Sequence, residues 1–207
     1  MTGRFVTLEG GEGVGKSTQS RALAEALRAR GLAVVETREP GGSPGAEAIR
    51  ELLLQGDVDR WTAESEALLF AAARADHVTR TIRPALDRGA WVLCDRFLDS
   101  SIAYQGLVGD VGAEAIRQLH QVGSGGFLPD RTLLLRLEDD EAVARTQVRD
   151  ASGADRFGAR DSDYHARINA AFDQLAAEDP GRYRMIDASG EPGEVTARLL
   201  SALEDLL

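Results

Sequence analysis

Two kinds of hydrophobic pattern alternate along this chain. Short apolar runs have the length and composition of buried strands; they lie at 5–8, 33–37, 91–94, 132–137 and 183–187. Longer segments with apolar residues at every third or fourth position are typical of helices; they follow residues 15 and 42 and lie near 62–88, 113–122, 141–149, 164–177 and 195–206. The alternation predicts an α/β fold with a five-stranded parallel sheet flanked by helices on both faces.

The longest predicted helix carries a regular apolar face. Val78, Ile82 and Leu86 follow each other at intervals of four residues, and Leu68 is predicted to extend the same face. A proline at position 84 is expected to kink the end of this helix, because proline lacks the amide hydrogen that a helix requires.

The loop after the first predicted strand contains the strongest motif. It fits G-x-x-x-x-G-K-[ST], the phosphate-binding P-loop, and comprises Gly10, Gly11, Glu12, Gly13, Val14, Gly15, Lys16, Ser17 and Thr18. Glycines permit positive φ angles that turn N–H groups toward a polyphosphate, and the following helix favours anions at its N-terminus. Lys16 would reach the β- and γ-phosphates, and the Ser17 hydroxyl would bind Mg²⁺. A glycine-rich turn with a surface lysine is the alternative, and the strand and helix around the motif disfavour it.

Charged residues stand where the second and third predicted strands end. Arg38 and Glu39 precede Pro40, and Asp95 and Arg96 follow an apolar run. Because ligands of open α/β sheets bind at the carboxyl ends of strands, Asp95 is a candidate to hold Mg²⁺ through water and Arg96 to bind a phosphate. Alternatively, Arg38 and Glu39 form a solvated turn, and Asp95 and Arg96 only pair with each other.

A candidate base-binding pair lies in the longest predicted helix. Phe70 and Arg74 are four residues apart and therefore share one side of the helix. The ring would stack on a planar base while the guanidinium donates hydrogen bonds to it. The segment 97–106 is rich in hydroxyl and amide groups that suit a base or a sugar. The alternatives are a core position for Phe70 and an exposed position for Arg74.

A polar, glycine-containing stretch at 150–158 is bracketed by Arg145, Arg149 and Arg156. This composition predicts a mobile lid at about 145–160 that brings cations over a transferring phosphoryl group. The alternative is an ordinary exposed loop with arginines at a helix end.

The charge balance argues against one class of function. The chain has 207 residues, with 24 Lys and Arg against 34 Asp and Glu, and a net charge of −10 at pH 7. Nucleic-acid binders need a basic surface, so we expect no nucleic-acid partner. A phosphorylated substrate must instead be met by locally grouped arginines.

The remaining composition predicts one soluble cytoplasmic domain spanning residues 1–207. Cys94 is the only cysteine, so it cannot form an internal disulfide, and its apolar neighbours predict an inert core thiol. The sequence shows no signal-peptide pattern and no run of about 18 apolar residues, so we expect no membrane partner. It also shows no internal repeat and no linker-like segment.

Together, the motifs resemble those of the bacterial thymidylate kinase family. The resemblance rests on the P-loop and on the segments at 37–42, 69–74, 95–97 and 100–106, and it continues through 129–130 and 155–157. The P-loop alone is common to many NTPases, whereas the whole set is specific. The resemblance implies transfer of the ATP γ-phosphate to dTMP, giving dTDP in dTTP biosynthesis, with Mg²⁺ as cofactor and a homodimer as the assembly.

The resemblance also implies how the acceptor's phosphate is held. Arg38 and Arg96 match the arginines that bind the phosphate of dTMP. Glu12 matches an acidic P-loop position near the acceptor's sugar and phosphate. Glu39 and Arg50 match positions near the acceptor site.

Other positions match the residues that recognise the nucleoside. Phe70 matches the ring that stacks on thymine, and Arg74 matches the donor to its O4 atom. Ser101 and Gln105 match polar contacts to the base edge. Tyr104 matches the aromatic residue that crowds the 2′ position of the sugar and so disfavours ribose.

The P-loop and the predicted lid indicate a subtype. One subtype has an arginine within the P-loop and no cations in the lid, whereas this chain has Gly13 and Val14 in the P-loop and arginines in and beside the lid. It is therefore similar to the lid-arginine type, in which Arg149 and Arg156 are the candidate transition-state cations and Arg145 is a second choice.

Two other interpretations stay open. Another nucleoside monophosphate kinase on the same scaffold would differ in its acceptor. A P-loop regulatory switch would bind nucleotide without transferring a phosphate; a GTPase switch would carry an Asn-Lys-x-Asp motif, which the sequence lacks.

Overall fold

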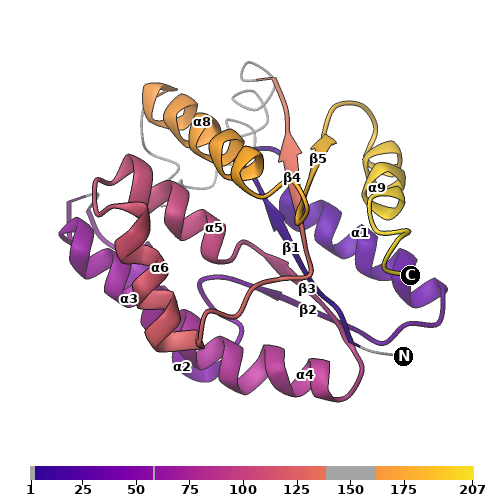
Figure 1. The fold of residues 1–207 in the computed structure, drawn as a ribbon, viewed down its shortest axis with the longest axis horizontal. Helices are drawn as coiled ribbons and strands as arrows, with labels where there is room; N and C mark the ends of the chain where they lie inside the picture. The colour runs from indigo at the N-terminus through magenta and orange to yellow at the C-terminus, as the bar shows by residue number, and fades with distance from the viewer. Residues whose placement is uncertain (1–2, 58, 139–161) are drawn as a thin grey trace.

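A computed structural model of the chain describes residues 3–57, 59–138 and 162–207. Within these ranges five strands form one sheet in the order β2-β3-β1-β4-β5, and all neighbouring strands are parallel (Figure 1). The strands are β1 (Phe5–Glu9), β2 (Val34–Arg38), β3 (Trp91–Asp95), β4 (Arg131–Arg136) and β5 (Tyr183–Asp187). The predicted five-stranded parallel sheet is confirmed.

Helices cover both faces of this sheet. They are α1 (Lys16–Ala29), α2 (Pro44–Leu54), α3 (Ala63–His77), α4 (Arg83–Asp87), α5 (Leu98–Ser101), α6 (Ala113–Ser124), α8 (Ser162–Glu178) and α9 (Pro192–Ser201). Two π-helical segments, η1 (Val78–Ile82) and η2 (Ile102–Val108), continue α3 and α5. Helices α1 and α9 lie on one side of the sheet, and α3, α6 and α8 lie on the other (Figure 1).

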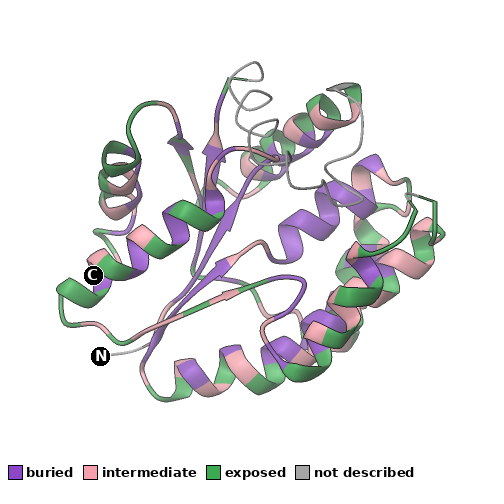
Figure 2. Cartoon of the chain, turned by 180° about the vertical axis from the view of Figure 1, so that it is seen from behind, coloured by how far each residue is buried: buried purple, intermediate pink, exposed green. Residues whose placement is uncertain are grey.

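Alternate residues of each strand point to opposite faces and fill two separate cores. One core joins Phe5 and Val92 to the helices α3, α6 and α8. The other core joins Val6 and Leu93 to α1 and α9. Figure 2 shows the central strands buried and the outer faces of the helices exposed, as expected for a parallel sheet covered on both sides.

The register of the strands brings their carboxyl ends together. Asp95, the last residue of β3, lies opposite Leu8 of β1 and opposite Arg38 of β2. The loops after β1, β2 and β3 therefore leave the sheet side by side, and these loops carry the P-loop and the charged pairs of the sequence analysis.

The longest predicted helix exists as the continuous series α3, η1 and α4. Val78 and Ile82 are buried as predicted, but Leu68 is 55% exposed. Its expected place on the buried face is wrong, because Leu68 lies at the outer edge of the contact between α3 and α6. The π-helical segment precedes Pro84, whose missing amide hydrogen removes one helical bond.

Among the described residues, no helix combines the length and the apolar content that crossing a bilayer requires.

Candidate active site

A cavity of about 630 Å³ opens at the carboxyl ends of β1, β2 and β3. Loops after these strands, together with α3 and η2, form its wall. Most of the predicted site residues line it: Glu12, Gly13, Val14, Gly15, Lys16, Ser17, Thr18, Arg38, Glu39, Arg50, Phe70, Arg74, Asp95, Arg96, Ser101, Tyr104 and Gln105. Gly10 and Gly11 are buried beneath it. The predicted lid at 145–160, with Arg145, Arg149 and Arg156, lies outside the described residues.

The P-loop has the backbone geometry that its glycines predict. Gly10, Gly13 and Gly15 have φ angles of 135°, 74° and 89°, in the region that favours glycine. A Cβ atom at Gly10 would also lie 2.5 Å from the carbonyl oxygen of Leu135, so no side chain fits there. The loop leads directly into α1, and no side chain of the described residues caps this helix. Its first N–H groups are thus available to an anion.

Lys16 is buried at the base of the cavity. Its Nζ atom donates to the carbonyl oxygens of Gly10 and Gly11, at 3.1 and 2.6 Å. Burial, and secondarily the positive charge of Arg96, lowers the pKa of Lys16 to about 8. A bound polyphosphate would supply the negative charge that this ammonium group lacks.

Ser17 and Asp95 form a hydrogen-bonded pair beside the P-loop. The Ser17 hydroxyl donates to Oδ2 of Asp95 at 2.6 Å. The alternative in which Asp95 pairs with Arg96 is wrong, because the ion pair of Arg96 is with Glu12. No group of three or more His, Cys, Asp or Glu side chains that could hold a metal occurs in the described part of the chain. A hydroxyl and one carboxylate nevertheless suit Mg²⁺, which takes its other ligands from water and phosphates.

Arg96 projects into the cavity from a strained backbone position with a φ angle of 68°. Its guanidinium donates to Glu12 at 2.6 Å and to the Ser100 hydroxyl at 3.1 Å, and it lies 5.1 Å from the centroid of the Tyr104 ring. Its third hydrogen bond goes to the Gly10 carbonyl at 3.3 Å. The Arg96 cation is thus held against the cavity by a carboxylate, a hydroxyl and a carbonyl group.

Two further arginines lie at the rim of the cavity. Arg38 has a side chain that is 51% exposed and pairs with Glu47 at 3.1 Å. Arg50 donates to the carbonyl oxygen of Pro40 at 2.7 Å, which fixes the turn after β2. The alternative of a solvated turn is therefore right for Arg38, which is exposed, and wrong for Glu39, which is buried.

Arg74 also lines the cavity. It is buried, so its predicted alternative, an exposed position, is wrong. It donates from Nε to Glu39 at 2.7 Å and from Nη2 to the Ser101 hydroxyl at 2.7 Å. Phe70 is half-buried one turn away and also lines the cavity. Gln105 donates to Glu66 at 2.9 Å. Phe70 and Arg74 thus line the same cavity, as their spacing on one side of a helix predicted.

Sequence reasoning missed Glu9, the fully buried last residue of β1. One carboxyl oxygen accepts from the N–H of Phe97 at 2.8 Å, and the other accepts from the Ser100 hydroxyl at 2.6 Å. Burial, and then the nearby charge of Asp99, raises the pKa of Glu9 to about 7. The signal was available, since Glu9 is an acidic residue at the end of an apolar strand, as Asp95 is.

Sequence reasoning also missed His77, which lies three residues after Arg74 in α3. It is fully buried, and its Nδ1 atom lies 3.0 Å from Oε1 of Glu39. The spacing of three places His77 and Arg74 on neighbouring parts of one helix face, but nothing in the sequence indicates that both meet a glutamate 35 residues or more upstream.

Comparisons with known proteins identify the family of the chain. A family model described as thymidylate kinase matches residues 8–199. The chain is 65% identical over 207 residues to the thymidylate kinase of Rhizorhabdus wittichii, and the match covers 100% of both chains. It is 50% identical over 206 residues to that of Nitrobacter hamburgensis, covering 99% of this chain and 90% of the relative.

The fold is similar to that of a solved structure. The crystal structure of thymidylate kinase from Ehrlichia chaffeensis superposes with a TM-score of 0.80 at 31% sequence identity, and covers 99% of this chain and 100% of that one.

Proposed function

The chain belongs to the thymidylate kinase family and transfers the γ-phosphate of ATP to dTMP, giving ADP and dTDP, and we propose that the residues of the cavity perform this transfer with Mg²⁺. One observation carries the assignment of these residues: Lys16 of the P-loop and Arg74 of α3 line the same cavity. A phosphate site and a base site are thereby joined at the carboxyl ends of the strands.

The donor's phosphates occupy the P-loop in this proposal. Lys16 leaves the carbonyl oxygens of Gly10 and Gly11 and moves its charge to the β- and γ-phosphates. The N–H groups at the start of α1 bind the same anion. Because phosphoryl transfer needs alignment and charge neutralisation more than covalent chemistry, these positions supply most of what the donor requires.

Ser17 and Asp95 are the residues that would hold Mg²⁺, with Asp95 acting through water. When bound, the ion would neutralise negative charge on the phosphates. The 2.6 Å hydrogen bond between the two side chains already places both oxygens on one side of the P-loop. Titration with Mg²⁺ in the presence of ATP should therefore show weaker metal binding for Asp95→Asn, and unchanged binding would remove Asp95 from this role.

Arg96 and Arg38 bind the phosphate of dTMP in this proposal. Arg96 exchanges its contact with Glu12 for the phosphate, and Glu12 turns to the sugar and phosphate of the acceptor. Arg38 adds a second cation from the rim. The attacking atom is a phosphate oxygen that is already nucleophilic, so no strong general base is needed. Glu39 and Arg50, predicted near the acceptor, shape the turn between these cations and the base end.

The nucleoside occupies the other end of the cavity. Phe70 stacks on thymine, and Arg74 donates to its O4 atom. Ser101 and Gln105 contact the base edge, and Tyr104 fills the space beside the 2′ position. Support comes from the fact that all five residues line the same cavity, which therefore offers both aromatic faces and hydrogen-bond donors.

Arg149 and Arg156 are proposed as the cations of the transition state, with Arg145 as second choice, on sequence grounds alone. The double change of Arg149→Ala with Arg156→Ala should lower kcat while dTMP binding stays nearly intact. An unchanged kcat would exclude this role.

The test of the whole assignment is a panel of nucleoside monophosphates with ATP and Mg²⁺. We expect dTMP to be the preferred acceptor in an assay coupled to ADP formation, and Phe70→Ala to weaken it more than ATP. Equal turnover of a purine monophosphate would favour a different kinase on this scaffold. Tight ATP binding with no transfer to any acceptor would favour a P-loop switch.

We further propose that residues 1–207 act as one kinase domain in a homodimer. Leu68 and Val122 are 55% and 88% exposed, and both border an apolar groove between α3 and α6. Exposed apolar patches of this kind mark interaction sites. Sedimentation should give a dimer that Val122→Glu dissociates, whereas Met185→Glu, at an exposed apolar position on β5, should leave it intact. A monomeric wild-type protein would overturn this assembly.

A cytoplasmic location is proposed as well, because the only cysteine of the chain is a buried free thiol in β3 and no disulfide is needed.

A further inference from the structure

Arg74 is held at several points. Its Nε atom donates to Oε2 of Glu39 at 2.7 Å, and its Nη2 atom donates to the Ser101 hydroxyl at 2.7 Å and to the Phe97 carbonyl at 3.2 Å. The Phe97 ring lies 5.2 Å from the guanidinium carbon. Since the guanidinium is planar, fixing Nε and Nη2 also fixes Nη1. That nitrogen has no hydrogen bond to any described residue, and Arg74 lines the cavity.

Glu39 supports this arrangement from behind. It is 5% exposed, and its two oxygens are divided between two partners: Oε2 accepts from Arg74, and Oε1 lies 3.0 Å from Nδ1 of His77. A buried carboxylate needs such partners to offset its lost hydration. Both oxygens are therefore engaged inside the protein, which lets Glu39 hold Arg74 in one orientation.

His77 completes the support. It is fully buried, and both ring nitrogens have partners, Nδ1 with Glu39 and Nε2 with the Thr37 hydroxyl at 2.7 Å. A carboxylate can only accept, so Nδ1–H donates to Glu39, and the Thr37 hydroxyl can then donate to Nε2. The imidazole thus connects β2 to α3 and fixes the orientation of the carboxylate.

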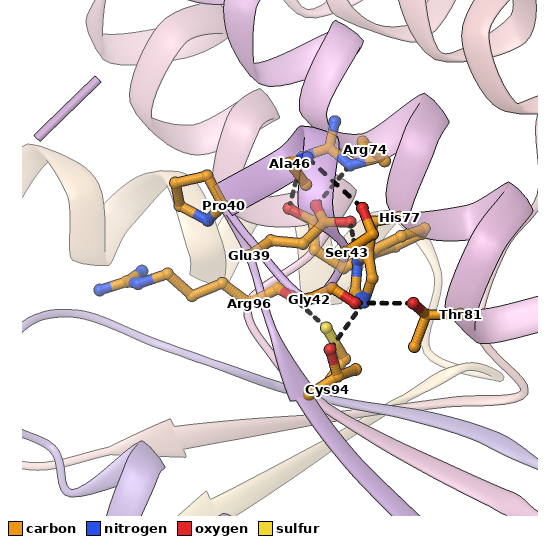
Figure 3. A network of polar contacts seen from close by, with 12 residues as sticks. Glu39, Pro40, Gly42, Ser43, Ala46, Arg74, His77, Thr81, Cys94 and Arg96 are labelled. Carbon is orange, nitrogen blue, oxygen red and sulfur yellow. Dashed lines mark hydrogen bonds and ion pairs between the residues drawn. The ribbon is translucent and has the colours of Figure 1, made fainter. Parts of the chain in front are cut away.

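The loop after β2 closes over this ring. Gly42 has a φ angle of 83°, and a Cβ atom there would lie 2.4 Å from Nε2 of His77 and 2.3 Å from the Thr37 hydroxyl oxygen. Thr81 donates to the Gly42 carbonyl at 2.6 Å and fastens the loop in place. Figure 3 shows Glu39 between Arg74 and His77, with Gly42 and Thr81 beside the imidazole.

We propose that Glu39 and His77 are positioning residues for Arg74 and thereby determine the selection of a pyrimidine with a carbonyl group at C4. The inference rests on the proposed role of Arg74 as the base reader. A guanidinium only donates hydrogen bonds, so a rigidly held Nη1 pairs with a C4 carbonyl and rejects a C4 amino group. If Glu39 or His77 is replaced, Arg74 is no longer held in this orientation. The enzyme then discriminates less between a base with a C4 carbonyl and a base with a C4 amino group.

The test compares kcat/KM for dTMP with kcat/KM for dCMP, which carries the amino group at C4. His77→Phe keeps a planar ring and removes both nitrogens, and Glu39→Gln removes the charge. Each should lower the dTMP preference by about tenfold, through a higher KM for dTMP, with the KM for ATP within about twofold of wild type. His77→Asn, which keeps a donor near the Nδ1 position, should restore most of the preference.

Two further variants guard against a general packing defect. Thr37→Val removes only the outer hydrogen bond of the half-buried Thr37, and should lower the preference by about threefold even if the His77 variants fold poorly. Thr62→Val removes the N-terminal cap of α3, the helix that carries Arg74 and His77, at an exposed position, and should leave the preference unchanged. Equal losses in Thr62→Val and His77→Phe would overturn the proposal.

Arg74→Ala separates this inference from the proposed function on which it rests. If Arg74→Ala keeps the dTMP preference, Arg74 is not the base reader and its proposed function fails. If Arg74→Ala loses the preference while Glu39→Gln, His77→Phe and Thr37→Val keep it, Arg74 reads the base without this support and the present inference fails.

Discussion

The proposed phosphate site and the proposed base site hold their cations in different ways. At the proposed phosphate site, Lys16 is bonded to two loop carbonyls, Arg96 to Glu12 and Arg38 to Glu47, and an arriving phosphate would replace these partners. At the proposed base site, Arg74 is bonded to Glu39 and Ser101 through Nε and Nη2, which leaves Nη1 for a base.

The difference follows from what each end must do. Phosphates arrive, change charge during the reaction and leave, so their cations need partners that can be exchanged at little cost. A base is only recognised, and recognition improves when the reading group loses no conformational freedom on binding. The cavity thus combines an adaptable half with a preorganised half.

The largest expected effect lies at the phosphate end. Lys16→Ala should raise the free-energy barrier measured by kcat/KM by at least about 3 kcal/mol, because it removes the cation proposed to neutralise the transferring phosphoryl group. Steady-state kinetics with both substrates varied would measure this. Arg21→Ala, which removes a charge from an exposed position of the same helix, is the matched control and should behave like wild type. Wild-type turnover in Lys16→Ala would refute the assignment.

Glu9 lies behind Arg96 in this network of hydrogen bonds. Its carboxylate accepts from the Ser100 hydroxyl, which in turn accepts from Arg96. Burial, and then Asp99, raises the pKa of Glu9 from 4.5 to about 7, so the native state holds this proton more tightly than the unfolded chain. The resulting stabilisation is complete below about pH 4.5 and is lost as the pH rises through 7.

Relative to Glu9→Gln, the wild type should therefore lose roughly 3 kcal/mol of unfolding free energy between pH 4.5 and about pH 7. Urea unfolding of both proteins at intervals of pH would measure the difference. Parallel pH profiles for the two proteins would show that Glu9 does not titrate in this range.

At the base end, Arg74→Ala should weaken dTMP binding by about 2 kcal/mol, roughly thirtyfold, because a hydrogen bond from a charged donor is lost. ATP binding, measured by calorimetry on the same sample, should change by less than about twofold. Because the change removes the arginine that pairs with the buried carboxylate of Glu39, the double variant with Glu39→Gln serves as the control for stability. Equal weakening of ATP and dTMP would make Arg74 a scaffold residue.

The smallest effect is expected at the rim. Arg38 is half exposed and its pair with Glu47 is open to solvent, so its attraction for a phosphate is screened. Arg38→Ala should raise the KM for dTMP by about threefold and leave kcat nearly unchanged. A loss as large as that of Lys16→Ala would place Arg38 at the reaction centre and weaken the distinction between rim and interior.

Much of the fold could be predicted because its signals are local. Apolar runs such as 91–94 indicated buried strands, and the glycines of the P-loop indicated the positive φ angles that Gly13 and Gly15 adopt. Phe70 and Arg74 face the same cavity because four residues complete about one helical turn.

What the sequence did not predict depends on residues that are distant in the sequence but neighbours in the fold. Periodicity placed Leu68 on the apolar face of α3, but it gives no information on where a neighbouring helix stops covering that face. The pairing of Arg74 with Glu39 depends on the distance between α3 and the end of β2, which only the folded chain defines. Buried acids such as Glu9 were missed because an acidic residue in a sequence does not show whether it is solvated.

The buried position of Lys16 has a practical consequence. It is the only lysine among 207 residues, since the other cationic side chains are arginines, and its pKa of about 8 leaves a large share of the amine neutral in mildly basic buffer. Amine-reactive dyes and sensor surfaces can therefore couple to only two places, the N-terminus and the nucleotide pocket. The extent of coupling at Lys16 should therefore report how much of the pocket is occupied, because bound ATP would protect this amine from the reagent.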